Sequence, residues 1–171
     1  MQNITRRSFV RNTALWLGCG LLVRTFGNTL FAAEQAAPPP KAEKPPRLDL
    51  DVVKEFVVVS HSDLARVKEL HAEYPTLINA THDFGGGDFE TALGAASHTG
   101  QKEIARYLLD NGARIDIFCA TMFGMLDVVQ RIIELYPDMK HTKGPHGLSL
   151  LHHAKKGENP EMIAYIESIS G

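Results

Sequence analysis

Three histidines and two carboxylates are the side chains of this 171-residue chain best suited to binding chemistry. If His61, His98 and His146 converge on one face with Asp88 or Glu90 nearby, they form a mixed nitrogen and oxygen set that suits zinc or another transition metal. However, the chain has no His-x-x-x-His pair on one helix. The ligands would have to come from three separate segments, so neither a metal ion nor another cofactor is predicted.

Nucleophilic catalysis finds less support in the sequence. Ser60 and Ser97 are each followed by a histidine, but neighbours in sequence do not orient a nucleophile towards a base, and there is no Gly-x-Ser-x-Gly elbow. Cys119 lies among apolar residues, which favours a buried packing role. The run 85–87 lacks the Gly-Lys-Ser or Gly-Lys-Thr ending of a phosphate-binding loop and indicates a flexible loop tip. We therefore predict that the protein is not an enzyme.

The segments that must position these side chains follow a repeated apolar pattern. Apolar residues stand four, five, eight and nine places after Gly100, and the same distances recur after Gly124. This spacing places four side chains on one stripe of a helix, and a stripe needs neighbouring helices to cover it. Further copies of the pattern lie at residues 56–70 and 149–166. The two clearest stripes are Ile104, Ala105, Leu108 and Leu109, and Val128, Val129, Ile132 and Ile133.

This pattern resembles the ankyrin repeat, whose period is about 33 residues. The resemblance covers roughly residues 47–168 and implies an all-α, ankyrin-like solenoid of about four helix-turn-helix repeats. It also implies a module that binds a protein partner through its concave face. The matching positions are Thr91, Leu93, Ala96, Gly100, Leu108, Leu109, Gly112, Ala113 and Asp116, where the family has Thr, Leu, Ala, Gly, Leu, Leu, Gly, Ala and Asn or Asp.

The repeat is irregular at one point. Gly100 and Gly124 are 24 residues apart, where the family period predicts about 33. We therefore expect no β-finger between residues 112 and 117, and a helix that begins at Ile117 with Asp116 as its cap. The loop at residues 79–91 is long instead, and it predicts one extended, glycine-rich finger.

The family pattern also selects the residues expected to contact a partner, namely those just before each inter-helix turn and those at the fingertips. An exposed Met122 and Phe123 would serve as interface anchors. The alternative interpretation is that both are packed in the interior. The resemblance further implies that His152 ties adjacent repeats together by hydrogen bonds. The predicted partner-binding residues are His61, Asp88, Glu90, His98, Thr99, Met122, Phe123, His146 and Lys156.

The N-terminal region resembles a twin-arginine export signal in Thr5, Arg6, Arg7 and Phe9. The apolar stretch at residues 13–23 suits a signal peptide and is well short of the ~20 residues that span a bilayer. Lipid attachment at a cysteine in this stretch is a minor alternative. We predict three segments: a signal peptide at residues 1–33, a Pro-rich linker at 34–46 and an ankyrin-repeat domain at 47–171.

Charge restricts the class of partner. Residues 47–171 contain 12 Lys and Arg against 18 Asp and Glu, a net charge of −6, which disfavours nucleic acid. These residues contain a single cysteine, Cys119, so no internal disulfide is expected. The sequence thus predicts a periplasmic or secreted bacterial interaction module that keeps no membrane span after signal cleavage. The alternative is a periplasmic protein that binds a metal or small ligand with a histidine-bearing surface.

Overall fold

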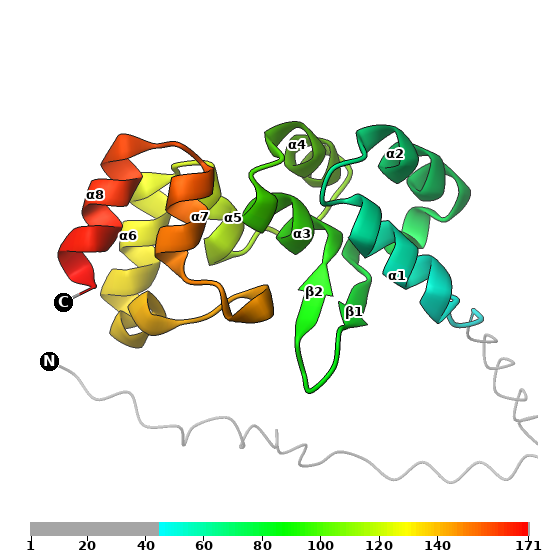
Figure 1. Ribbon diagram of the computed structural model, residues 1–171, viewed down its shortest axis with the longest axis horizontal. Helices are drawn as coiled ribbons and strands as arrows, with labels where there is room; N and C mark the ends of the chain where they lie inside the picture. The colour runs from blue at the N-terminus through cyan, green and yellow to red at the C-terminus, as the bar shows by residue number, and fades with distance from the viewer. Residues whose placement is uncertain (1–44, 171) are drawn as a thin grey trace, which may run out of the picture. The chain divides into compact units, whose positions relative to one another are not determined.

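The computed structural model describes residues 45–170, which are mostly helical. Within these residues eight α-helices follow one another as four pairs, each joined by a short turn (Figure 1). The predicted signal residues Thr5, Arg6, Arg7 and Phe9 lie outside the described residues, as does most of the predicted linker. The helices are α1 (Leu50–Val59), α2 (Leu64–Glu73), α3 (Ala92–Thr99), α4 (Lys102–Asp110), α5 (Ile117–Met122), α6 (Leu126–Leu135), α7 (Leu150–Lys156) and α8 (Pro160–Ile169).

The first helices of the last three pairs begin with the same type of cap. The side-chain oxygens of Thr91, Asp116 and Ser149 each accept a hydrogen bond from the backbone N–H three residues later, at 3.0, 2.8 and 3.3 Å. Such a cap satisfies an otherwise unpaired N–H and typically stabilises a helix by about 1 kcal/mol. Helix α5 therefore begins at Ile117, as predicted, and no strand forms between residues 112 and 117.

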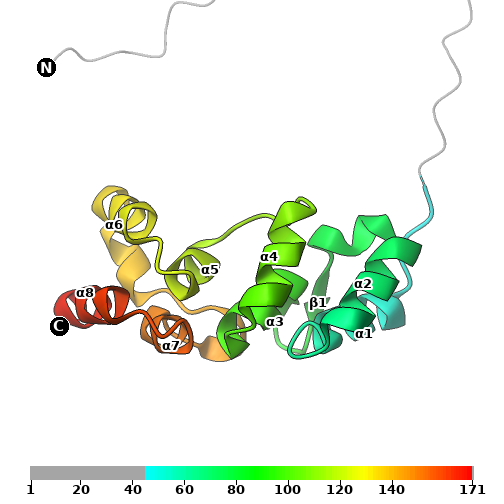
Figure 2. The same cartoon turned by 90° about the horizontal axis from the view of Figure 1, so that it is seen from above.

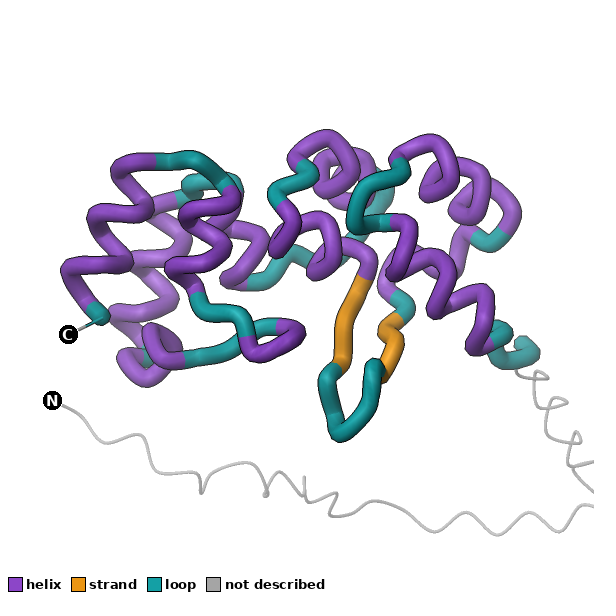
Figure 3. Tube along the Cα trace, viewed as in Figure 1, coloured by secondary structure: helices purple, strands orange, loops and turns teal. Residues whose placement is uncertain are grey.

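A β-hairpin precedes α3. Strand β1 (Thr81–Asp83) pairs antiparallel with β2 (Phe89–Thr91), and the hairpin projects away from the helices (Figure 3). The three glycines at residues 85–87 have φ values of 119°, 67° and 89°, a range that side-chain-bearing residues rarely adopt. No atom lies within 4 Å of a Cβ built at any of the three. The turn thus requires glycine for its backbone conformation and not for lack of space.

The apolar stripes are buried to different extents in α4 and α6. In α4, Leu108 is fully buried, and Leu109 packs against the same core from a partly exposed position. In α6, Val129 is fully buried and Ile132 is partly buried, but Val128 is 45% exposed. The prediction that Val128 lies in the buried stripe is therefore wrong. Helix α6 instead buries Val129 and Ile133 in an apolar cluster with residues of α7 and α8, and Val128 lies outside that cluster. Helix α6 also contacts the 3-10 helix η2 (Pro137–His141).

The helix pairs do not simply stack in chain order. Helix α3 contacts α7 as well as α5, and Figure 2 shows α5 and α6 set to one side, above α7 and α8. The contact between the second and fourth pairs includes a hydrogen bond. The ammonium group of Lys102 donates it to the carbonyl oxygen of Gly157, at 2.7 Å. Because the link between α4 and α5 forms no hairpin, the third pair is displaced and the fourth reaches the second directly.

Two apolar clusters form the core. The first surrounds Phe56, Leu93 and Leu108, which belong to the first two pairs, and also includes Met122 of α5. The second joins the third and fourth pairs and contains Val129, Leu150, Met162 and Ile166, among others. Helix α5 therefore contributes to both clusters.

Candidate functional site

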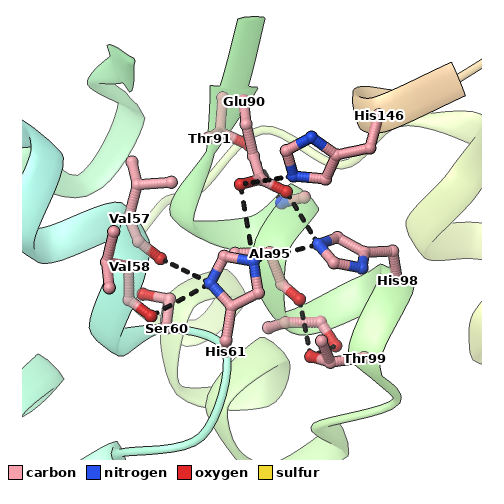
Figure 4. Close-up of polar contacts among 12 residues, drawn as sticks. Val57, Val58, Ser60, His61, Glu90, Thr91, Ala95, His98, Thr99 and His146 are labelled. Atoms are coloured by element: carbon pink, nitrogen blue, oxygen red, sulfur yellow. Dashed lines mark hydrogen bonds and ion pairs between the residues drawn. The ribbon is translucent and has the colours of Figure 1, made fainter. Parts of the chain in front are cut away.

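A group of polar side chains surrounds Glu90 of strand β2 (Figure 4). The Glu90 side chain is fully buried. Its Oε1 lies 2.9 Å from His98 Nε2, and its Oε2 lies 3.4 Å from His146 Nε2 and 3.6 Å from His61 Nε2. His61 Nε2 and His98 Nε2 are 3.1 Å apart. We call these four residues the Glu90 cluster; one ligand atom from each fits within 4.8 Å of all the others, so together they could hold a metal ion.

The outer nitrogens of two of these imidazole rings face hydrogen-bond acceptors. His61 Nδ1 lies 3.2 Å from the carbonyl oxygen of Val57 and 3.0 Å from that of Val58, at the end of α1. His146 Nδ1 lies 2.7 Å from Asp88 Oδ2. A neutral imidazole has one N–H and one lone pair, so a ring that donates from Nδ1 presents its lone pair at Nε2.

Asp88 holds His146 with both of its oxygens, because Oδ1 also accepts a 2.7 Å bond from the His146 backbone N–H. These two hydrogen bonds lower the pKa of Asp88, and the bond from the backbone N–H has the larger effect. Burial acts to lower the pKa of His146, but the bond to Asp88 and the charges of Glu90 and Asp88 outweigh it, so the pKa is raised. His146 has φ 57° and ψ 22°, a left-handed conformation that is uncommon outside glycine.

The cluster draws on three helix pairs. His61 follows α1, Glu90 and His98 belong to β2 and α3, and His146 lies in the 3-10 helix η3 (Pro145–Gly147), which precedes α7. In α7, His152 Nε2 bonds the carbonyl oxygen of His98 at 2.8 Å. This bond joins the fourth pair to the second, and the contact between α3 and α7 brings the segment carrying His146 beside Glu90.

The structure thus brings together His61, Asp88, Glu90, His98 and His146, five of the residues predicted to contact a partner. One of them occupies a different environment from the one expected. Glu90 was predicted at an exposed fingertip, but it has no exposed surface and cannot contact a partner. That prediction is wrong, since β2 turns Phe89 outward and Glu90 inward.

Two other predicted contact residues lie in the interior to different extents. Met122 is completely buried, so the prediction that it anchors a partner is wrong. The turn after α7 covers it: a Cβ built on Gly157 would overlap the carbonyl of Met122. Phe123 is partly buried against the first core cluster, and the Arg106 guanidinium lies 5.7 Å from the centre of its ring.

Thr99 and Lys156 line an open groove of about 590 Å³ between the second and fourth pairs. Its other lining residues include Lys102, Lys155 and His152. The sequence does not predict that Lys102 and Lys155 lie on this surface, because the contact between α3 and α7 that forms it skips a helix pair. The sequence shows that these residues are lysines, but it does not show that they lie around one groove.

The remaining nucleophile candidates are held in structural contacts. The hydroxyls of Ser60 and Ser97 donate to the carbonyl oxygens of Phe56 and Leu93, at 2.7 and 2.6 Å. Burial raises the pKa of the Cys119 thiol to about 11, so the thiol is protonated at neutral pH.

Residues 88–120 match the family model of the ankyrin repeat. The matched segment begins near the tip of the hairpin and runs through α3 and α4 into α5. The match supports an ankyrin-repeat protein; ankyrin repeats are generally protein–protein interaction modules and are typically not enzymes. Searches of curated proteins and of solved structures found no significant match. Within residues 45–170, every helix is too short or too polar to cross a membrane.

Proposed function

We propose that this protein is an exported ankyrin-repeat interaction module that binds a protein partner in the groove between α3 and α7. The ankyrin-repeat match supports the class of function. The groove supports the location, since it contains Thr99 and Lys156, two residues that the family pattern independently assigns to the partner-binding face. In this proposal the four helix pairs form an ankyrin-type array, and the hairpin at residues 81–91 is its one long finger.

The groove chemistry favours an acidic partner segment. Lys102, Lys155 and Lys156 line it with a single carboxylate, Glu158. The three lysines form no ion pair with any residue in the described part of the chain, although Lys102 donates to a backbone carbonyl. A positive groove on a domain of net charge −6 attracts carboxylates locally and repels acidic proteins elsewhere on its surface. This charge pattern provides a basis for selectivity.

A charge-reversal pair tests the groove. Lys155→Glu combined with Lys156→Glu should abolish co-purification of the partner from an envelope extract of the source bacterium. The matched control is Lys54→Glu with Lys140→Glu, which makes the same change of charge in α1 and η2, away from the groove. Equal capture of the partner by both double variants would refute the assignment of this groove.

Export is a separate part of the proposal. It is supported by the twin-arginine pattern at residues 5–11 and by the five prolines between residues 38 and 46, which favour an extended tether ahead of the array. We propose a periplasmic or secreted location. Changing Arg6 and Arg7 together to Lys should retain the protein in the cytoplasm, as measured by cell fractionation. Unchanged export of this variant would contradict the twin-arginine route.

A further inference from the structure

We propose that Glu90, His61, His98 and His146 form a site for one divalent transition metal ion of the zinc type. The site adjoins the proposed partner groove, because His98 is followed by the groove residue Thr99, but the two sites share no residue. It therefore adds a second binding activity that does not depend on the first.

The spacing of the four ligand atoms fits a single ion. In tetrahedral coordination, with bonds of about 2.0 to 2.1 Å, neighbouring ligand atoms are about 3.3 to 3.4 Å apart. With Glu90 Oε2 as the carboxylate ligand, its separations from His146 Nε2 and His61 Nε2 are 3.4 and 3.6 Å, and His61 Nε2 lies 3.1 Å from His98 Nε2. One ligand atom from each of the four residues lies within 4.8 Å of all the others. These three separations lie close to the tetrahedral value, so the proposed site requires side-chain adjustments only where other pairs of ligand atoms are farther apart.

The hydrogen bonds behind the cluster indicate that a cation is needed there. The only partners of His61 Nδ1 in the described structure are carbonyl oxygens, which cannot donate, so this nitrogen carries the proton. The same holds for His146 Nδ1, which faces Asp88. Unless Nε2 is protonated as well, both rings direct its lone pair towards the Glu90 carboxylate, which also has only lone pairs to offer. Acceptors that face one another repel unless a cation lies between them.

The burial of the Glu90 carboxylate increases the need for a cation beside it. Glu90 is fully buried, and neither of its oxygens has a hydrogen-bond partner in the described structure. The 2.9 Å approach of His98 Nε2 to Oε1 is a close contact without hydrogen-bond geometry. An ionised carboxylate removed from water is strongly destabilising unless it is paired or coordinates a metal. The three rings around it supply the remaining ligands.

The donor set selects the class of ion. Three imidazole nitrogens with one carboxylate oxygen suit zinc, nickel, cobalt or copper, whereas magnesium and calcium require mostly oxygen ligands. Asp88 supports the assignment, because a carboxylate bonded to the outer nitrogen of a ligating histidine fixes its orientation and raises its basicity. Four protein ligands complete a tetrahedral shell, which is typical of a tightly held structural ion.

The test is a Zn²⁺ titration of the full-length chain after removal of metal with a chelator, followed by equilibrium dialysis and elemental analysis. We expect one Zn²⁺ per chain. Asp88→Asn should lower the affinity by about 10- to 100-fold, and His98→Gln should lower it further. His141→Gln, which changes an exposed histidine in η2, should leave the affinity unchanged.

A second measurement does not depend on the folding of any variant. Co²⁺ bound to the unmodified chain should give the intense visible absorption of tetrahedral coordination. If the chain retains no Zn²⁺, or if Co²⁺ gives the weak absorption of an octahedral ion, the cluster is held by protons alone and the proposal is refuted. Binding that survives His98→Gln would likewise refute it.

Discussion

Replacing Gly100 by Ala should destabilise the protein more than replacing Gly112 by Ala. Both glycines follow a helix and have left-handed backbone conformations, with φ values of 79° and 92°. They differ in their surroundings. A Cβ on Gly100 would lie 2.8 Å from the carbonyl oxygen of Lys156, whereas a Cβ on Gly112 would have no atom within 4 Å. The comparison therefore isolates the contact between the second and fourth helix pairs.

The expected loss in the free energy of unfolding has two parts. A left-handed alanine costs about 1 to 2 kcal/mol in either variant. In the Gly100 variant, the new methyl group is closer to Lys156 O than the 3.4 Å at which ordinary contacts begin, and both groups are fixed to backbone. The end of α7 must move, and forced repacking of this kind costs about 1 to 3 kcal/mol more. We expect losses of about 2 to 5 kcal/mol for Gly100→Ala and about 1 to 2 kcal/mol for Gly112→Ala.

Urea unfolding followed by far-ultraviolet circular dichroism measures both free energies of unfolding. The slope against urea concentration should be the same in the two variants, so that the difference in midpoint reports stability alone. Equal losses would mean that Lys156 does not approach Gly100. The direct contact of α3 with α7 would then be wrong, and with it the basis for both proposed binding sites.

Three further predictions concern the core. Leu108→Ala should cost about 2 to 5 kcal/mol and Leu109→Ala clearly less, because only Leu108 is fully buried; urea unfolding distinguishes them. Val128→Glu should change stability by less than about 0.5 kcal/mol, whereas Val129→Glu should prevent folding, as seen by circular dichroism. Burial lowers the pKa of His153 from 6.5 to about 4, so below pH 6.5 protons bind preferentially to the unfolded chain. The free energy of unfolding should therefore fall by up to about 3 kcal/mol as the pH drops from 6.5 to 4, and less steeply in His153→Leu, as urea titrations at several pH values would show.

Local structure followed closely from sequence. The start of α5 was predictable because Asp116 is a good cap and the link before it is too short for a hairpin. The turn glycines were predictable from their spacing, and Gly100 and Gly124 both have positive φ values. These features depend on interactions between residues close in the chain, which the sequence displays directly.

The Glu90 cluster was only partly predictable. The residue types of His61, His98 and His146 make their convergence a possible metal site, but the sequence does not predict one, because the ligands lie on separate segments. What brings them together is the contact between α3 and α7, a long-range consequence of the displaced third pair. No local pattern indicates where a displaced pair will pack.

Burial of individual residues was the least predictable property. The repeat pattern assigns Met122 to an open face, but the turn at Gly157 covers that face. The side chain of Glu90 points inward from its strand and is buried, although charged side chains usually lie at the surface. In both cases the neighbour that decides the environment comes from elsewhere in the chain.

The short link between α4 and α5 makes the helix pairs of this chain non-interchangeable. In a regular array each unit touches only its neighbours, so units can be added, deleted or replaced by consensus versions with local effects. Here we expect a full-length finger inserted at residues 113–116 to change the position of α5 and α6 and to move α7 away from α3. Lengthening or idealising the array at that point would separate His146 from Glu90 and Lys156 from Thr99, yielding a more uniform protein without either binding site.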